Sequence, residues 1–399
     1  MLTACTKEID FPDEAIEELT GQLDLGGSLL KNSIGIVHCG YEYIESGFLA
    51  LLCELLPFDV VGSTTISGAT RGEYGPTLLT LSVLTGDDVM FSTALSDPLP
   101  LPPDDVGRPL SDAYRRAAET LPGKPALVIA HLPLNTAVGV SLMLDGITNA
   151  GGDVPVFGAL ACEEMPDYAN SLVIFNGKAY PGSGVLVLAF GALHPRFFVE
   201  SLAARERLHG QQGVITESEG CVVKQVNGMP FLEYMEDMGM PPEIMREAKA
   251  FPIPFKVDYN EGTKGVIRVL FSVTPEGHAV FVSEMPVGAS MSLQRIGKGD
   301  VMETVADMAE ILDSLDGIQG VLLHSCIGRS YLLGLQADDE MIGLSGVAQK
   351  APCQLSYSGA ELCPLEDEKG TPINHTHAYS LTACVFLERP KGSDIDEAE

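Results

Sequence analysis

The stretch Val321-Leu322-Leu323-His324-Ser325-Cys326-Ile327-Gly328-Arg329 carries the strongest structural signal in this sequence of 399 residues. Three apolar residues run directly into a polar segment that contains a histidine, a serine, a cysteine and an arginine. This pattern is typical of a buried strand that ends at a site, because ligand groups gather at strand ends in α/β proteins. The stretch therefore predicts a strand of a covered sheet, with a candidate site where that strand ends.

Two further polar clusters lie later in the chain, each next to an apolar run. They are Tyr357-Ser358-Gly359-Ala360-Glu361 and Asn374-His375-Thr376-His377. Because ligand groups of different strands meet where the strands end, we expect the three clusters to line one pocket. The candidate ligand-binding residues there are Ser325, Cys326, Arg329, Tyr357, Glu361, Asn374 and Thr376.

The first half of the chain shows one pattern of elements twice. Each unit has a strand, a helix, a second strand that ends in glycine, and a two-stranded hairpin. The first unit consists of residues 34–39, 42–56, 59–62, 78–84 and 89–95. The second consists of residues 126–131, 137–149, 154–158, 172–175 and 185–190. Two β-α-β-β-β units in one order indicate an internal duplication, with His38 and His131 near the ends of matching strands.

A change in composition near residues 200–221 predicts a domain boundary, and two domains suit a chain of this length. We expect an N-terminal helical segment at 1–30, a first domain at 31–221, a second domain at 222–389 and an acidic tail at 390–399. The second domain should contain helices at 231–248 and 300–315, and strands at 265–272, 278–284, 353–357 and 378–387. The fold class is α+β and α/β-like, with repeated β-α-β-β-β units, mixed sheets and helices on the outer faces.

The composition excludes several classes of protein. A formal net charge of −31 opposes binding to nucleic acid and to anionic membranes, which both require positive charge. It suits a cationic partner, or it serves only solubility.

The nine cysteines are scattered without a C-x-x-C pair, which favours small core residues in a reducing cytosol over a zinc ribbon or disulfides. The sequence contains no run of about 18 apolar residues, so it predicts no membrane helix. We therefore expect a cytoplasmic protein.

Short segments in both halves carry a family resemblance. Val61-Gly62-Ser63-Thr64-Thr65, Phe157-Gly158-Ala159-Leu160 and Val226-Asn227-Gly228-Met229-Pro230 are three of them, and residues 325–329, 357–361 and 374–376 are the others. Together they resemble the FIST domain proteins, in which a FIST N-terminal domain precedes a FIST C-terminal domain. The chain departs from the family pattern at Ser67-Gly68, where Gly-Glu is frequent, and at Ala360, which is inserted between glycine and glutamate.

The resemblance implies a sensory input module of signal transduction that binds a small ligand, with an amino acid or a similar metabolite as the suggested class. Such modules are often joined to kinase, cyclase or chemotaxis output modules. We see no output module in this chain, so we expect the signal to pass to a separate protein. No cofactor, nucleic acid or membrane partner is expected.

Arg329 and Glu361 are the pair that best suits such a ligand. A guanidinium binds a carboxylate through two parallel hydrogen bonds, and a carboxylate accepts an ammonium group. Together the two side chains match the two ends of an amino acid. The alternative is a salt bridge between Arg329 and Glu361 that holds two loops together.

Cys326 is a possible nucleophile if Arg329 or His324 stabilises its thiolate. A buried structural thiol is the favoured interpretation, because free cysteines are common in cores. His375 and His377 point to one face of a strand and, with Cys363 nearby, form a weak candidate for zinc. Strand-end histidines such as His131 and His324 more often bond to a backbone carbonyl than act in catalysis.

Ser63, Thr64 and Thr65 follow a glycine at a strand end and complete the set of candidate ligand-binding residues. Their hydroxyl and amide groups either hold a carboxylate or cap the next turn.

Three functional hypotheses follow, because the sequence contains no complete catalytic motif. The first is a sensory, small-ligand-binding protein without enzymatic activity. The second is an enzyme that uses Cys326, or a metal at His375 and His377, on a small substrate. The third is a scaffold without a ligand, whose acidic surface meets a basic protein.

Overall fold

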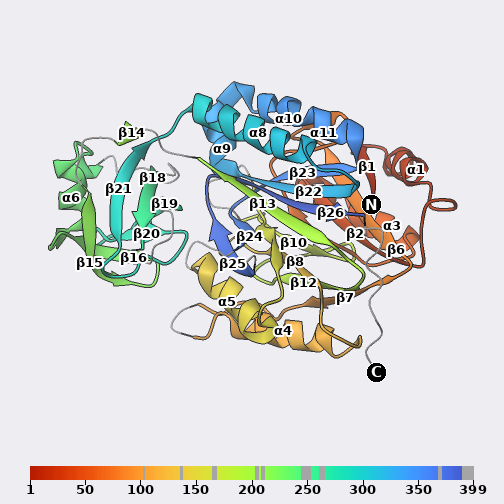
Figure 1. The fold of residues 1–399 in the computed structure, drawn as a ribbon, viewed down its shortest axis with the longest axis horizontal. Helices are drawn as coiled ribbons and strands as arrows, with labels where there is room; N and C mark the ends of the chain where they lie inside the picture. Colours follow the sequence, from red (N-terminus) through yellow and green to blue (C-terminus); the bar gives the residue numbers. More distant parts are fainter. Residues whose placement is uncertain are drawn as a thin grey trace.

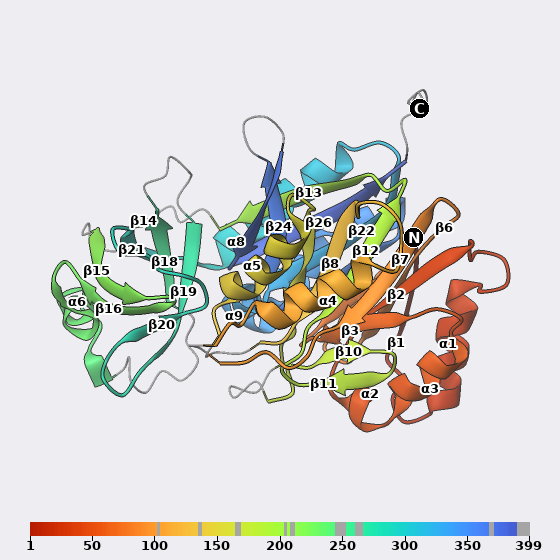
Figure 2. The same ribbon diagram turned by 90° about the horizontal axis from the view of Figure 1, so that it is seen from below.

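Three sheets, each with helices on its outer side, form the larger part of the molecule, which we call the body (Figure 1). A separate small barrel lies at one end of the body in both ribbon views (Figure 1, Figure 2). The structure is a computed structural model that describes residues 1–101, 104–134, 138–163, 169–202, 206–207, 212–243, 253–259, 266–366 and 371–388. In these ranges no helix is long and apolar enough to cross a membrane.

The first sheet is built around β2 (Asn32–Cys39). β3 (Val60–Thr64) pairs with β2 in parallel and β6 (Leu79–Gly86) pairs with it antiparallel. Its other strands are β1 (Leu2–Thr6), β10 (Val173–Phe175) and β11 (Lys178–Tyr180). Leu19 of α1 and Leu52 of α3 pack on the outer face of this sheet, because the apolar sides of both helices face it. The helices are α1 (Pro12–Leu23), α2 (Glu42–Glu45) and α3 (Phe48–Leu55).

The second sheet repeats this arrangement around β8 (Leu127–Leu132). β9 (Val156–Leu160) is the parallel neighbour and β12 (Val185–Gly191) the antiparallel one. Its other strands are β7 (Val89–Leu95), β24 (Glu361–Glu366) and β25 (Pro372–His377). Leu110 of α4 (Arg108–Ala118) and Met143 of α5 (Val140–Gly151) belong to the core on its outer face.

The third sheet has the same centre again, around β22 (Ile318–Cys326). β23 (Cys353–Ser358) pairs with it in parallel and β26 (Ser380–Leu387) antiparallel. Its other strands are β4 (Gly68–Thr70), β5 (Glu73–Gly75) and β13 (Pro195–Ser201). Its helices are α8 (Lys298–Asp313), α9 (Ile327–Leu333), α10 (Asp338–Gly343) and α11 (Ser345–Lys350), with the 3-10 turn η1 (Gly334–Gln336) between α9 and α10. Met308 of α8 and Met341 of α10 pack with Leu323 of the sheet.

The body therefore contains three related units, of which the sequence pattern predicts the first two. The two predicted units share a glycine in the second strand for a steric reason. A Cβ atom at Gly62 would lie 1.8 Å from the carbonyl oxygen of Val37, and one at Gly158 would lie 1.9 Å from that of Ala130. In the third unit Leu355 stands opposite Leu323, in the register that pairs Val37 with Gly62, so the glycine signal is missing there.

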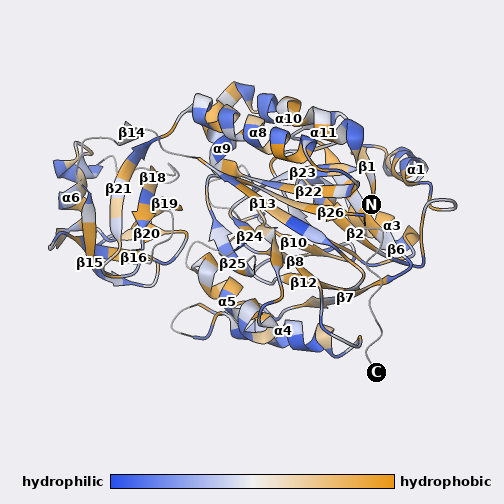
Figure 3. Cartoon of the chain, in the orientation of Figure 1, coloured by the Kyte–Doolittle hydropathy of each residue, from blue (hydrophilic) through white to orange (hydrophobic). Residues whose placement is uncertain are grey.

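One apolar core lies between the inner faces of the three sheets. Each sheet contributes to it, through Ile36 and Val61, Ile129 and Phe157, and Leu322 respectively. Figure 3 shows the same distribution, with mostly hydrophobic strands in the body and outer helices that alternate between hydrophobic and hydrophilic. The expected architecture of mixed sheets with helices on the outer faces is confirmed.

The small barrel is formed by six strands that close on themselves. The ring runs β21-β15-β16-β20-β19-β18 and returns to β21. The bounds are β15 (Gly213–Glu219), β16 (Val222–Val226), β18 (Ile253–Asp258), β19 (Val266–Val273), β20 (Ala279–Phe281) and β21 (Ser290–Arg295). β14 (Glu206–Arg207) and β17 (Met229–Pro230) pair with β21 and β16, and α6 is Phe231–Asp237. Phe231, Phe255 and Phe281 pack together in its core.

Both predicted hairpins of the repeated units are wrong. β6 pairs with β1 and β2, whereas β7 pairs with β12, so the turn at Gly86-Asp87 carries the chain between two sheets. β10 pairs with β3 and β11, not with β12. A turn signal between two strands shows that the chain reverses, but it does not determine which sheet the second strand joins.

Other predicted elements are found close to their expected places. The helix at 300–315 is α8, and the strands at 265–272 and 278–284 are the paired strands β19 and β20. The N-terminal segment contains α1, but β1 precedes it. The helix expected at 231–248 ends at Asp237, and residues 244–248 and the acidic tail at 390–399 lie outside the described residues. Strand pairing crosses the expected division at residue 221, since β23 pairs with β4 and β24 with β9.

Candidate functional site

The end of β22 is the point from which the candidate site is built. β22 ends at Cys326, and α9 begins at the next residue, so the chain turns from strand to helix without a loop. Ser325 and Cys326 occupy successive strand positions and therefore face opposite sides of the sheet. The Ser325 side contains a polar network under α10, and Cys326 borders a pocket.

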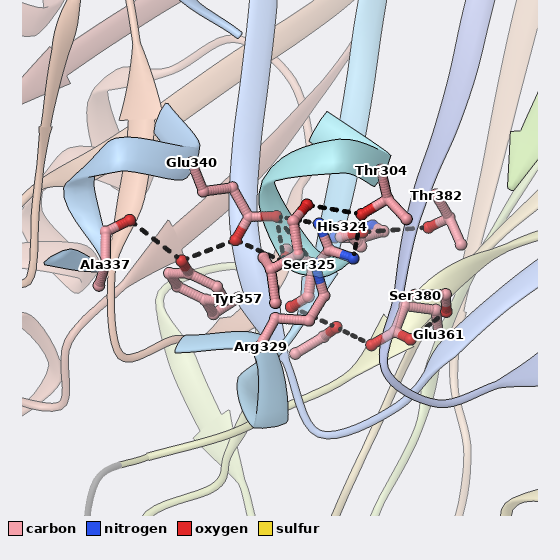
Figure 4. Close-up of polar contacts among 12 residues, drawn as sticks. Thr304, His324, Ser325, Arg329, Ala337, Glu340, Tyr357, Glu361, Ser380 and Thr382 are labelled. Carbon is pink, nitrogen blue, oxygen red and sulfur yellow. Dashed lines mark hydrogen bonds and ion pairs between the residues drawn. The ribbon is translucent and has the colours of Figure 1, made fainter. Parts of the chain in front are cut away.

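The polar network centres on an ion pair between Arg329 and Glu340 (Figure 4). Oε1 of Glu340 accepts hydrogen bonds from Nε of Arg329 at 3.0 Å and from Nη2 at 2.7 Å. Nη1 of Arg329 donates to Thr304 Oγ1 at 2.9 Å. Both charged side chains are fully buried, so each charge is balanced by its partner inside the protein and not by solvent.

Glu340 also binds two of the predicted site residues. The hydroxyl of Tyr357 donates to Oε2 of Glu340 at 2.8 Å, and the hydroxyl of Ser325 lies 3.0 Å from each carboxylate oxygen. Burial, and then the Glu340 charge, raise the pKa of Tyr357 well above its usual range. The sequence prediction missed Glu340, although it belongs to the acidic run Asp338-Asp339-Glu340 in the first turn of α10.

Glu361 lies in a separate set of hydrogen bonds. Ser358 donates to its Oε1 at 2.7 Å and Ser380 donates to its Oε2 at 2.7 Å. Burial raises the pKa of Glu361 to about 8, against the opposite effects of the two serines, Arg329 and Cys326, so the carboxyl group keeps its proton at neutral pH. The structure thus pairs Arg329 with Glu340 and leaves Glu361 as a largely uncharged group.

Three of the remaining predicted site residues bond to backbone groups of neighbouring segments. Thr64 Oγ1 donates to Asn170 O, and Thr65 Oγ1 donates to Tyr357 O, while Ser63 is buried in β3. Asn374 accepts from Val156 N at 2.8 Å through its side chain and donates to Val154 O at 2.9 Å. These contacts use the polar groups of Thr64, Thr65 and Asn374 within the fold.

Thr376 lies where the body meets the small barrel. Its carbonyl oxygen accepts from Arg268 Nη1 of β19 at 3.3 Å, and its hydroxyl lies 3.5 Å from that of Ser283. Val140 N of α5 donates to Val282 O at 3.1 Å in the same region. Polar contacts around β20 and β25 therefore join the barrel to the body, beside an apolar cluster that contains Val269 of β19 together with Leu333 and Tyr379 of the body.

A pocket opens beside these contacts, and we call it the Cys326 pocket. The body lines it with Leu134, Cys326, Gly328, Tyr331, Ala378 and Tyr379, together with Ile327 and Gly359. The barrel lines it with Val269, Phe271 and Val282. Its cavity volume is about 40 Å³, which holds only a few water molecules. Of the predicted site residues, the pocket includes Cys326.

Cys326 is expected to react slowly with thiol reagents at pH 7. Burial and the nearby Glu361 raise the pKa of its thiol well above the usual range, and the thiolate is the reactive form. The measurement is the rate of iodoacetamide labelling at Cys326, followed by peptide mass spectrometry, with the half-buried Cys221 of the barrel as the internal reference. Labelling of Cys326 ahead of Cys221 at pH 7 would contradict this expectation and favour a nucleophilic cysteine.

The histidines considered for metal binding do not form a metal site in the described residues. The rings of His375 and His377 lie 6.4 Å apart, and Nε2 of His377 lies 2.9 Å from the carbonyl oxygen of Cys363. In the ranges that the structure describes, no group of three or more His, Cys, Asp or Glu side chains is arranged to hold a metal ion.

Three other histidines, one from each unit, meet in the central core. The ring of His38 lies 5.2 Å from that of His131 and 5.4 Å from that of His324, and we call the three the histidine layer. Both ring nitrogens of His38 and of His131 are buried without a hydrogen bond, and Nδ1 of His324 lies 2.9 Å from Ser356 Oγ. Burial lowers the pKa of all three, to about 4 for His131 and about 3 for His324, so the layer is uncharged at neutral pH.

Comparison with known proteins gives matches to two domain families and distant likenesses to solved structures. The FIST N domain matches residues 33–229 and the FIST C domain matches residues 231–364. No curated protein matches the sequence. A cyanuric acid hydrolase from A. caulinodans is 12% identical over 97% of this chain and 99% of its own, with a TM-score of 0.34. A phosphoribosylformylglycinamidine synthase II from Thermotoga maritima is 9% identical over 98% and 73%, with a TM-score of 0.18. TM-scores this low carry no argument about this chain.

Proposed function

The chain belongs to the FIST family, whose domains are sensory domains of signal transduction, and from this premise we propose that it is a cytoplasmic sensor that binds a small ligand in the Cys326 pocket. One observation carries the proposal. The pocket lies at the end of β22, and both the body and the small barrel contribute to its walls. Ligands of α/β proteins bind at such strand ends, and pockets between two parts of a protein are frequent binding sites.

The position of the pocket also suggests how binding is transmitted. A ligand that touches both the body and the barrel favours the arrangement in which both walls contact it. The shift toward this arrangement is set by how much more tightly the ligand binds it than other arrangements. The polar contacts of Thr376 with Arg268 and Ser283 lie at the same junction, where a bound ligand would rearrange them. We propose that a separate output protein reads the position of the barrel.

An amino acid held between Arg329 and Glu361 has less support than a ligand in the pocket. Arg329 is bonded to Glu340 and Thr304, and Glu361 to Ser358 and Ser380, so the two side chains do not present free charges to a ligand. Slow labelling of Cys326 in the experiment above would also favour a sensor over a cysteine enzyme.

Filling the Cys326 pocket is expected to abolish ligand binding. In Val282→Phe the larger side chain occupies the cavity from the barrel side, whereas Val287→Phe places the same side chain on the same domain at a position that is 61% exposed. The measurement is thermal shift and native mass spectrometry of both variants and the wild type against a library of amino acids and small metabolites. A ligand at a hundredfold excess over its dissociation constant stabilises the folded protein by about 2.7 kcal/mol.

We expect at least one compound to stabilise the wild type and Val287→Phe but not Val282→Phe. If no compound stabilises any of the three proteins, the proposal of a small-ligand sensor fails. Consumption of a compound by the wild type would show an enzyme instead.

A further inference from the structure

The walls of the Cys326 pocket are almost entirely apolar. Among the described residues that line it, none has a charged side chain, and the polar groups are the thiol of Cys326 and the hydroxyls of Tyr331 and Tyr379. A carboxylate or ammonium group that entered it would lose its hydration without gaining an opposite charge. The pocket therefore discriminates against ions.

Glu361 and Arg329, two ionisable side chains near Cys326, are bonded to other partners. Glu361 lies behind Cys326 and is neutral at pH 7 because burial raises its pKa to about 8. Arg329, in the helix that follows Cys326, is fully buried and bonded to Glu340. Neither end of a zwitterion therefore finds a counter-charge at the base of the pocket.

Tyr379 forms one wall in a backbone conformation that favours glycine. Its φ is 54°, a left-handed conformation that is unusual for an aromatic residue because its Cβ crowds the backbone. The conformation places the ring against Gly328, where a Cβ atom would lie 2.7 Å from Cε1 of the ring. A strained residue held by a glycine at a pocket wall is typical of a binding site, because strain persists where the surroundings enforce a particular geometry.

Aromatic side chains surround the cavity from both parts of the molecule. Tyr379 and Tyr331 come from the body and Phe271 comes from the barrel, and Tyr331 is 45% exposed at the entrance. Aromatic rings favour flat partners, which they contact by offset stacking or edge to face. An aromatic molecule does not fit a cavity of about 40 Å³, so its binding requires Tyr331 and the barrel wall to move outward.

We propose that the ligand of the Cys326 pocket is a small, uncharged aromatic molecule, held between Tyr379, Tyr331 and Phe271. This inference rests on the proposed function and specifies its ligand class. It replaces the two charge contacts of an amino acid with the burial of a flat apolar surface, which is worth about 25 cal/mol for each Å² removed from water.

The test compares indole with L-tryptophan, which carries the same ring on a zwitterion. The protein contains no tryptophan, so the fluorescence of either probe can be excited apart from that of the protein. We expect indole emission to shift to shorter wavelength on binding to the wild type and to Val287→Phe, with phenol and benzyl alcohol as competitors. L-Tryptophan should bind at least about tenfold more weakly, which corresponds to about 1.4 kcal/mol.

Two variants place the bound probe. Val282→Phe should weaken indole binding by at least about tenfold, the equivalent of about 1.4 kcal/mol. Tyr331→Ala removes a side chain that is 45% exposed and should weaken indole binding severalfold, so it serves as the second test if Val282→Phe does not fold. Equal binding by wild type and Tyr331→Ala, or by wild type and a folded Val282→Phe, overturns the assignment to this pocket.

The outcomes separate the ligand class from the sensor function. If L-tryptophan binds as tightly as indole and loses its binding in Val282→Phe, the ligand class is wrong and the sensor function stands. If indole, phenol and benzyl alcohol all fail to bind while a metabolite stabilises the wild type, the class is again wrong and the function again stands. If neither the probes nor the metabolite library bind, both proposals fail.

Discussion

Lowering the pH from 7 to 5 is expected to destabilise the protein through the histidine layer. His38, His131 and His324 are buried and uncharged, and their pKa values lie below the value of about 6.5 that histidine has in an unfolded chain. Below pH 6.5 the unfolded chain therefore binds protons that the folded protein does not. Each histidine loses about 2 kcal/mol of stabilisation between pH 7 and pH 5, or about 6 kcal/mol for the three.

Glu361 acts in the opposite direction. Its pKa is raised to about 8 in the folded protein, so between pH 8 and about pH 4.5 the folded state holds a proton that the unfolded state has released. Its contribution to stability therefore increases as the pH falls, by about 3 kcal/mol between pH 7 and pH 5. The three histidines outweigh it, and a net loss of about 3 kcal/mol remains. His377, whose pKa burial lowers to about 4, adds to the loss.

The measurement is urea unfolding at pH 7, 6 and 5. His131→Phe removes one titrating group of the layer. The number of protons that the chain takes up on unfolding should therefore fall by about one, and the unfolding free energy should depend less steeply on pH. His194→Gln is the control, because His194 is exposed and lies outside the layer. An unfolding free energy that rises steadily from pH 7 to pH 5 would show that the layer is not held in the uncharged state.

Glu340→Ala is the substitution with the largest expected effect on stability. It leaves the guanidinium of Arg329 buried without a counter-charge and removes the acceptor of Tyr357 and Ser325. Breaking a buried ion pair by removing one partner costs about 3–5 kcal/mol. The measurement is the free energy of unfolding in urea at pH 7.

Two further variants separate the charge from the packing. Replacing both partners, as Arg329→Met with Glu340→Leu, removes the uncompensated charge and should recover most of the loss, because apolar pairs of similar volume often replace a buried ion pair at little cost. Lys350→Ala breaks the exposed pair with Asp313 and should cost no more than about 1 kcal/mol. If Glu340→Ala costs no more than Lys350→Ala, the buried pair does not stabilise the fold.

The sequence predicted local features of the fold well, because these depend on neighbouring residues. The apolar runs around Ile36, Ile129 and Leu322 are strands, and the spacing of Val301, Val305, Met308 and Leu312 gives α8. The pairing of strands was less accessible. It depends on contacts between distant segments, such as β6 with β1 and β10 with β3, for which hydrophobic periodicity contains no information.

The sequence predicted where the candidate site lies better than it predicted which residues contact one another there. The stretch from His324 to Arg329 does end a buried strand beside a pocket, and Tyr357 does share one hydrogen-bond network with Arg329. The partner of Arg329 could not be chosen from the sequence, because Glu340 and Glu361 are equally plausible until the helix α10 is placed. The aromatic walls of the pocket come from Phe271 and Tyr379, which no motif distinguishes.

The crossing of strands between distant segments has a consequence for synthesis on the ribosome. β4 has no sheet to join until β23 emerges, and β9 has an unpaired edge until β24 follows it, about two hundred residues later. At roughly 5–20 residues per second that delay is about ten to forty seconds. An open edge strand is a template for aggregation, so we expect the nascent chain to be prone to aggregation until β23 and β24 have been translated.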